Sequence, residues 1–157
     1  MEAVSCLSRE AGPEGMVGGQ VLDMAGEGRA LTRGELEQLQ QLKTGALISA
    51  AAELGCIAAG GTEEQRRAIK EYARCIGRAF QIQDDILDVI GDSKELGKAT
   101  GSDAQNHKQT YVTLHGLEES GREVERLTGE AVAILDSFSG EHEFLKELLL
   151  HLVHRTK

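Results

Sequence analysis

The chain has 157 residues, 40% of them hydrophobic, and a formal net charge of −9 at pH 7. It contains no Trp, three Phe and two Tyr, so its apolar content comes from aliphatic side chains, which favours an all-α protein. The length is sufficient for one domain with its own core, and the acidic balance argues against binding to nucleic acids or anionic membranes. No run of about 18 apolar residues occurs, so we predict no transmembrane helix.

Glycines and helix caps divide the chain into predicted helices. Thr32 with Glu35, and Thr62 with Gln65, have the spacing of a capping box, in which the first residue caps the helix and the second reaches back. The predicted helices span residues 1–11, 16–26, 32–59, 62–90, 110–116, 118–138 and 141–155, with a polar stretch over 91–109. Strand alternation, internal repeats and domain boundaries are absent from the sequence, so we treat residues 1–157 as one unit.

The three cysteines are interpreted as structural residues. Cys6, Cys56 and Cys75 are odd in number and have no C-x-x-C spacing, and Cys56 and Cys75 stand among Ala and Ile. This pattern is typical of small core residues in a reducing compartment, rather than of disulfides or a zinc site. The N-terminus lacks the basic-then-apolar order of a signal peptide. We therefore expect a cytoplasmic protein.

Three carboxylates lie within the apolar segment from Phe80 to Asp92. On a helix, Asp84 and Asp88 share one face, with Asp85 beside them and Gln81 one turn earlier. Apolar residues fill the other faces, which predicts a buried helix, and buried carboxylates need a cation. Hard oxygen ligands suit Mg²⁺, with Mn²⁺ as an alternative. The competing interpretation is a solvated acidic face.

Two further segments supply cations. Lys43-Thr44 places one cation and one hydroxyl in a helix of small and apolar residues, and lysine binds phosphate as a point charge. The alternative for Lys43 is a surface lysine whose stem lies along apolar neighbours. The segment 96–103, followed by Lys108, adds Lys98 and Lys108, and taken alone it is a polar loop.

Together these features resemble a known family. The motifs, in order, are Met16-Val17-Gly18-Gly19-Gln20 with Asp23, Lys43-Thr44-Gly45-Ala46-Leu47-Ile48, Gly77-Arg78-Ala79-Phe80-Gln81-Ile82-Gln83-Asp84-Asp85-Ile86-Leu87-Asp88, Leu96-Gly97-Lys98, Asp103, Lys108 and Thr110-Tyr111. They resemble the C-terminal half of trans-isoprenyl diphosphate synthases, the polyprenyl synthetase family, and in particular its bacterial farnesyl diphosphate synthase branch. The resemblance implies an all-α helical bundle of the isoprenoid synthase type, here in its C-terminal part only.

The resemblance also implies an activity. It is Mg²⁺-dependent prenyl transfer, which condenses an allylic diphosphate with isopentenyl diphosphate to give farnesyl or geranylgeranyl diphosphate. By the same resemblance, Asp84, Asp85 and Asp88 are metal-site residues, Lys43, Thr44 and Lys98 act in catalysis and contact the substrate, and Phe80, Gln81 and Lys108 complete the substrate site. The expected ligands are isoprenyl diphosphates, and the full-length family implies a homodimer.

The chain departs from the family in one respect. The family's first aspartate-rich motif, followed by Arg-Arg, does not occur, and the paired Arg66-Arg67 has no aspartates before it. We therefore predict little or no activity for this chain alone, and apolar stripes on helices that would pack against the absent half. Three interpretations remain: a fragment of a farnesyl-type synthase, a truncated non-catalytic homologue that binds a full-length synthase, and a related Mg²⁺-dependent terpenoid enzyme.

Overall fold

The computed structural model describes residues 1–29, 31–94 and 110–155, without the side chains of 92–94. These residues form helices joined by short turns, and no strand occurs among them. The elements are α1 (Glu2–Ala11), α2 (Met16–Gly26), α3 (Arg33–Gln40), the π-helix η1 (Gln41–Gly45), α4 (Ala46–Ala58), α5 (Glu63–Lys94), α7 (Tyr111–His115), α8 (Leu117–Asp136) and α9 (Glu143–Val153). Within the described ranges, no helix is both long enough and apolar enough to cross a membrane.

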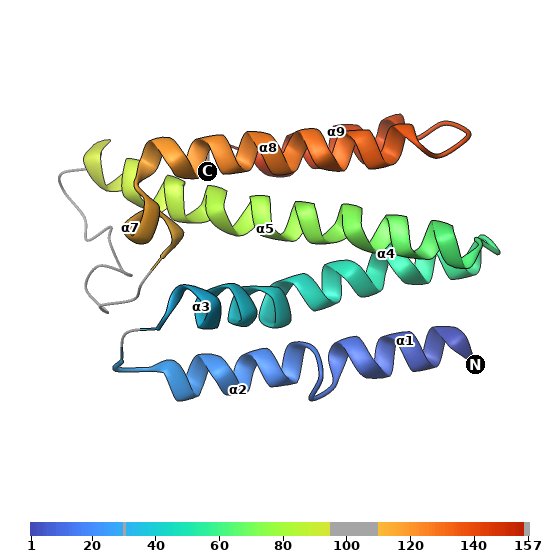
Figure 1. Ribbon diagram of the computed structural model, residues 1–157, viewed down its shortest axis with the longest axis horizontal. Coiled ribbons are helices and arrows are strands. Elements are labelled where there is room, and N and C mark those ends of the chain that lie inside the picture. Colours follow the sequence, from blue (N-terminus) through green and yellow to red (C-terminus); the bar gives the residue numbers. More distant parts are fainter. Residues whose placement is uncertain (30, 95–109, 156–157) are drawn as a thin grey trace.

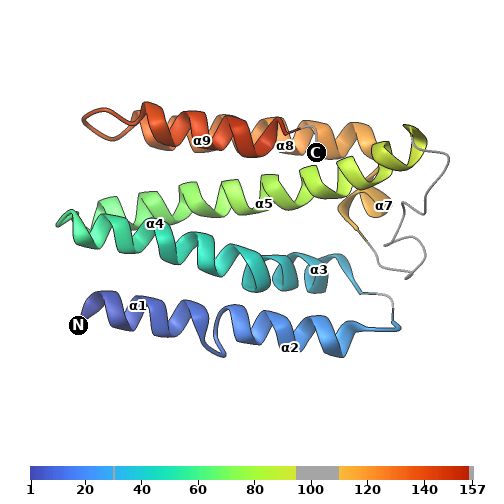
Figure 2. The same ribbon diagram turned by 180° about the vertical axis from the view of Figure 1, so that it is seen from behind.

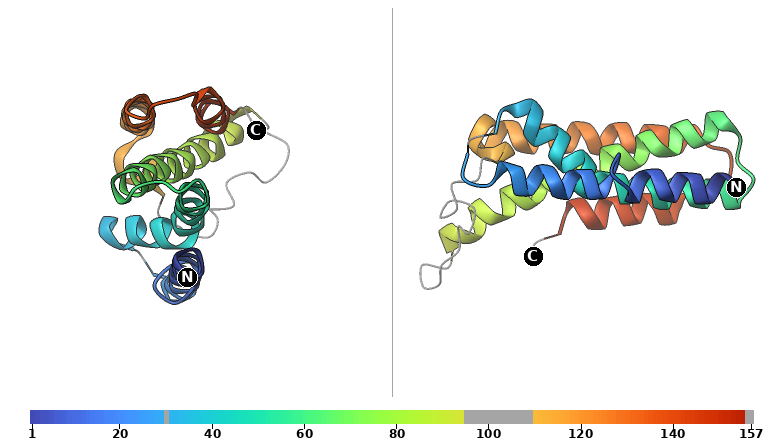
Figure 3. Two further views of the ribbon diagram at one scale, coloured as in Figure 1. Left: turned by 90° about the vertical axis from the view of Figure 1, so that its right-hand side faces the viewer. Right: turned by 90° about the horizontal axis from the view of Figure 1, so that it is seen from below.

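The helices form successive layers around α5 (Figure 1). α1 and α2 follow one another along one side, and α3, η1 and α4 form the next layer, against which α5 packs. Figure 2 shows the same order from behind, and the end view in Figure 3 shows α8 and α9 side by side over α5. This arrangement confirms the predicted all-α helical bundle.

Local sequence signals explain where two of the helices begin. The backbone N–H of Thr32 donates to Glu35 Oε2 at 2.8 Å, and the Glu35 N–H donates to Thr32 Oγ1 at 3.3 Å. Thr62 and Gln65 make the same reciprocal pair, at 2.8 and 3.2 Å. Each pair satisfies backbone donors that a helix start leaves without partners. Both predicted capping boxes are therefore confirmed.

One predicted boundary was wrong, because α5 continues to Lys94 instead of ending near residue 90. The helix predicted over 32–59 is confirmed as a continuous helical run from α3 to α4, and η1 is a π-helical turn within it. Such a single π-turn is not revealed by helix-period patterning. No glycine, proline or capping signal stops α5 at residue 90, because Gly91 alone is tolerated within a helix at a cost of about 1 kcal/mol.

The core lies between α5, α8 and α9. Its apolar side chains include Ile76, Ala79 and Ile82 on α5, and Leu127, Ala131, Leu135, Leu149 and Val153 on the two covering helices. The buried hydroxyl of Tyr72 donates to the carbonyl oxygen of Leu145 at 2.7 Å, which fixes the start of α9 against α5. The thiols of Cys6 and Cys75 are buried and unbonded to one another, as predicted, and Cys56 is half-buried.

Apolar side chains also remain exposed on α1 and α2. Val4, Val21 and Met24 are 70%, 59% and 72% exposed, and Leu7 and Val17 are exposed as well. The two helices that carry them, α1 and α2, form an outer layer of the bundle (Figure 3). The finding agrees with the expectation of uncovered apolar stripes, since a large exposed apolar patch marks a surface normally in contact with something else.

Candidate metal and diphosphate site

One strip of α5 carries four of the nine predicted site residues. Phe80, Asp84 and Asp88 follow one another at intervals of four residues, and Gln81 lies three residues before Asp84. These intervals place the four side chains on one side of the helix. Phe80, Gln81 and Asp88 are half-buried. The strip therefore offers two neighbouring carboxylates above an aromatic ring.

The carboxylate of Asp84 is more exposed than the apolar pattern predicted. Its side chain is 48% exposed, and Val89 and Ile90 beyond it are also exposed. The prediction of a buried acidic helix was wrong here, because within the described residues no helix covers this face. The pKa of Asp84 is still raised above its ordinary value, mainly by partial burial. The Arg155 guanidinium acts in the opposite direction, and the nearby Asp88 carboxylate adds to the increase.

Asp85 has a different environment from Asp84. Its Oδ2 accepts a hydrogen bond from the backbone N–H of Tyr111 at 2.7 Å, at the first residue of α7. Consecutive helical residues point about 100° apart, so Asp85 is turned toward α7. This carboxylate has a structural task in positioning α7, whereas Asp84 and Asp88 share the open strip.

Lys43 lies in η1 and is held by α2. Its Nζ is 2.5 Å from Oδ2 of Asp23, with both side chains partly exposed. The ion pair depends on a close approach of the two elements, because a Cβ placed on Gly19 would lie 2.3 Å from Lys43 N and 2.6 Å from Lys43 Cα. Glycine is needed where backbones approach this closely. Lys43 is thus neither a loose surface lysine nor in contact with Asp84.

A second close approach places η1 beside α5. A Cβ built on Gly77 would lie 3.4 Å from Gly45 Cα, so the two backbones nearly touch. Asp84 is seven residues beyond Gly77, which is about 10 Å along the helix. The point where η1 meets α5 therefore lies about two turns before Asp84 along α5. Lys98 and Lys108, the other predicted phosphate contacts, lie outside the described residues.

Arg155 completes the strip, a role that was not predicted from the sequence. It follows α9, and its Nη2 donates to Oδ1 of Asp84. Its Cζ is 3.9 Å from the centroid of the Phe80 ring, a cation–π contact. The sequence offered one signal for it, a basic residue at the end of the last helix. Nothing local indicated which carboxylate, 71 positions away, it would meet.

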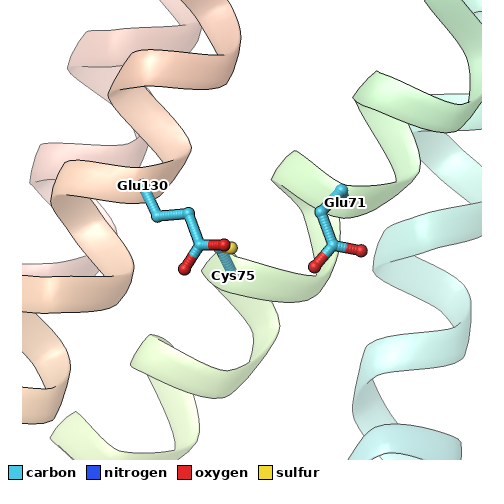
Figure 4. A group of neighbouring side chains, drawn as sticks. All are labelled: Glu71, Cys75 and Glu130. Atoms are coloured by element: carbon cyan, nitrogen blue, oxygen red, sulfur yellow. The ribbon is translucent and has the colours of Figure 1, made fainter.

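A different cluster of potential metal ligands occurs on α5 and α8. One oxygen each of Glu71 and Glu130 and the sulfur of Cys75 lie within 4.8 Å of one another (Figure 4). However, Glu71 is paired with Arg74 at 2.9 Å and Glu130 with Arg126 at 2.8 Å. Burial, and then the two carboxylates, raise the pKa of Cys75 to about 11. A neutral thiol and two neutralised carboxylates make a poor metal site, since thiols bind metals as thiolates.

One apolar cavity is separate from the carboxylates. It encloses about 490 Å³ between the end of α4, the start of α5 and the turn before α9, and its lining includes Cys56, Ile69, Tyr72, Phe138 and Leu145. Tyr72 is twelve residues before Asp84, or about 18 Å along α5. No charged side chain lines it. The cavity can hold an apolar group, but it offers nothing to neutralise a diphosphate.

The fold and the carboxylate strip define an all-α protein of the isoprenoid synthase type. Residues 1–148 match the Polyprenyl synthetase family, and the chain belongs to it. A farnesyl diphosphate synthase of Escherichia coli is 41% identical over 160 residues, covering 98% of this chain and 53% of that protein. Geranylgeranyl pyrophosphate synthase 11 of Arabidopsis thaliana is 44% identical over 144 residues, covering 90% of this chain and 40% of its own length.

Solved structures agree with this assignment. An FPP/GFPP synthase of Zymomonas mobilis superposes with a TM-score of 0.81 at 34% identity, over 97% of this chain and 50% of that one. A geranyltransferase of Helicobacter pylori, complexed with magnesium and isoprenyl diphosphate, superposes with a TM-score of 0.74 at 34% identity, over 97% and 50% of the two chains. The chain thus spans about half the length of these relatives.

Proposed function

We propose that this chain supplies the Mg²⁺-binding and diphosphate-binding half of a prenyltransferase that forms farnesyl or geranylgeranyl diphosphate. The observation that carries the proposal is the strip on α5, where Asp84 and Asp88 present carboxylates from one side of a helix. Support comes from the family of the chain and from the relative complexed with magnesium and isoprenyl diphosphate. The whole reaction belongs to a protein about twice as long.

The donor chemistry of the strip fits a hard divalent cation. Asp84 and Asp88 offer carboxylate oxygens, the ligands that Mg²⁺ prefers, and a cationic guanidinium already lies against Asp84. These two residues would hold the ion, and Asp85 would support the strip through α7. When bound, Mg²⁺ would neutralise the diphosphate leaving group as its bond to the allylic carbon breaks.

The other side chains have electrostatic and steric tasks. Lys43 would place a positive charge near the diphosphate, and Asp23 would hold it at that position until the substrate arrives. Thr44 and Gln81 would border the substrate, with Phe80 as an apolar wall that keeps water from the allylic cation. Lys98 and Lys108 are proposed as further diphosphate contacts on the basis of their motifs alone.

The test is calorimetric titration of the chain with pyrophosphate, with and without Mg²⁺. We expect Mg²⁺-dependent binding that Asp84→Asn and Asp88→Asn each weaken at least tenfold, which corresponds to about 1.4 kcal/mol. Glu125→Gln is the matched control, because it removes one exposed carboxylate from α8. Binding that is independent of Mg²⁺, or equal losses in all three variants, would contradict the proposal.

We also propose that the chain alone does not complete prenyl transfer. The family's first aspartate-rich motif, followed by paired arginines, does not occur in the 157 residues, so the sequence offers no second set of aspartates to oppose those of α5. Incubation of the purified chain with Mg²⁺, an allylic diphosphate and isopentenyl diphosphate should yield no longer prenyl diphosphate. Product formation at a rate proportional to the chain concentration would contradict this proposal.

A second candidate function is a non-catalytic partner of a longer synthase. The exposed apolar side chains of α1 and α2, led by Val4, Val21 and Met24, support it. Sedimentation of the chain mixed with a full-length farnesyl diphosphate synthase would distinguish the two roles. A stable mixed complex whose activity depends on this chain favours the partner role, whereas independent sedimentation favours the catalytic fragment.

A further inference from the structure

The guanidinium of Arg155 lies against the Asp84 carboxylate, where a metal ion bound by that carboxylate would also lie. Its Nη2 donates to Oδ1 of Asp84, an outer carboxylate of the strip. Asp84 and Asp88 are one turn apart, and their mutual repulsion favours any cation that comes between or beside them. Within the described residues, Arg155 forms an ion pair with Asp84. It therefore offsets the charge of Asp84 when no metal is bound.

The contacts of Arg155 hold its guanidinium in place but leave one of its hydrogen-bond donors without a partner. Its Cζ is 3.9 Å from the centroid of the Phe80 ring, so the guanidinium lies over an aromatic face while it pairs with Asp84. Its Nε is buried and has no hydrogen-bond partner among the described residues. A buried donor without a partner weakens the folded position of the side chain. The contact is thus specific in geometry, but the unpaired Nε makes it less stable than a fully hydrogen-bonded arginine would be.

We propose that Arg155 is a displaceable latch on the metal site, and that Mg²⁺ and Arg155 compete for the same carboxylate. The latch rests on the proposed metal-binding role of Asp84. With the metal absent, Arg155 ties the end of α9 to α5. When the metal binds, the guanidinium leaves Asp84, because two cations repel one another at one carboxylate oxygen. The affinity for the metal is therefore lower than the carboxylates alone would give.

The test measures Mn²⁺ binding by electron paramagnetic resonance of the free ion. Arg155→Gln should bind Mn²⁺ about threefold more tightly than the unaltered chain, the size expected for a partly exposed ion pair. Arg122→Gln is the matched control, since it removes the same charge from α8, where Arg122 pairs with Glu118. Phe80→Leu removes the ring under the guanidinium without a change of charge and should give a smaller increase. Circular dichroism of each variant verifies that it folds.

The outcomes test the competition by Arg155 and the metal-binding role of Asp84 separately. Equal affinities for the unaltered chain, Arg155→Gln and Arg122→Gln, with a loss in Asp84→Asn, would overturn the latch and leave the metal site intact. Weaker binding by Arg155→Gln would overturn it as well, since the arginine would then assist the metal. Binding unaffected by Asp84→Asn would overturn both proposals. In a ¹⁵N spectrum, Mg²⁺ should move the Arg155 Nε–H resonance in the unaltered chain and leave it in place in Asp84→Asn.

Discussion

Replacement of Gly19 by alanine tests how the close approach of α2 to η1 positions Lys43. The added Cβ would lie 2.3 Å from Lys43 N and 2.6 Å from Lys43 Cα. Ordinary van der Waals contact begins at about 3.4 Å, so α2 and η1 would have to separate by about 1 Å. Both obstructing atoms belong to the backbone, so a side-chain rotation cannot relieve the contact. The separation would also stretch the Asp23–Lys43 ion pair, which is 2.5 Å in the intact chain.

The size of the effect follows from two opposing terms. Overpacking costs about 1–3 kcal/mol, and a clash with backbone places Gly19→Ala at the upper end of that range. Alanine regains about 1 kcal/mol over glycine within a helix. We therefore expect Gly19→Ala to lower the free energy of unfolding by about 2 kcal/mol.

The assay is urea unfolding followed by circular dichroism, with Gly129→Ala as the matched control. Gly129 lies within α8, and a Cβ there would meet no atom within 4 Å. The control should therefore be more stable than the unaltered chain by up to about 1 kcal/mol. If Gly19→Ala were as stable as Gly129→Ala, the close approach of α2 and η1 would be refuted, and with it the account of how Lys43 is positioned.

Three further predictions concern buried groups and a helix cap. Tyr72→Phe removes the donor to a buried carbonyl and should lower the free energy of unfolding by about 1–2 kcal/mol in the same urea assay; an unchanged midpoint would contradict the hydrogen bond. The Arg29 hydrogen bond, followed by the backbone of the cap, lowers the pKa of Glu35 from 4.5 to about 2. The carboxylate therefore stabilises the fold fully above pH 4.5 and loses this effect as pH falls toward 2, so the stability difference between the unaltered chain and Glu35→Gln should shrink over that interval. Because burial raises the pKa of the Cys75 thiol to about 11, maleimide at pH 8 should modify the half-buried Cys56 first, and Cys75 only after unfolding; mass spectrometry of the labelled peptides would show the order.

The features that depend on local spacing could be predicted from the sequence. Each capping box joins two residues three positions apart, so its hydrogen bonds follow once a helix begins at Thr32 or Thr62. The shared side of Asp84 and Asp88 follows in the same way from their interval of four. The all-α fold followed from the helix caps, the glycine breaks and an aliphatic composition.

The features that depend on contacts between distant segments could not be predicted in this way. The π-turn at Lys43 occurs where α2 and α5 approach the same stretch of backbone, at Gly19 and Gly77. The pairing of Arg155 with Asp84 joins residues 71 positions apart. The exposure of Asp84 was misjudged because an apolar pattern indicates that a helix is covered, but not which of its residues the described helices leave exposed.

The central claim is that Asp84 and Asp88 form the metal and diphosphate site of this chain. It is tested most directly by ¹H–¹⁵N spectra recorded while pyrophosphate is added in the presence of Mg²⁺. We predict shifts of the α5 amides around Asp84 to Asp88, and their loss when Mg²⁺ is withheld or Asp84→Asn is used. Shifts centred on Glu71, Cys75 and Glu130, or shifts that persist without Mg²⁺, would contradict the claim.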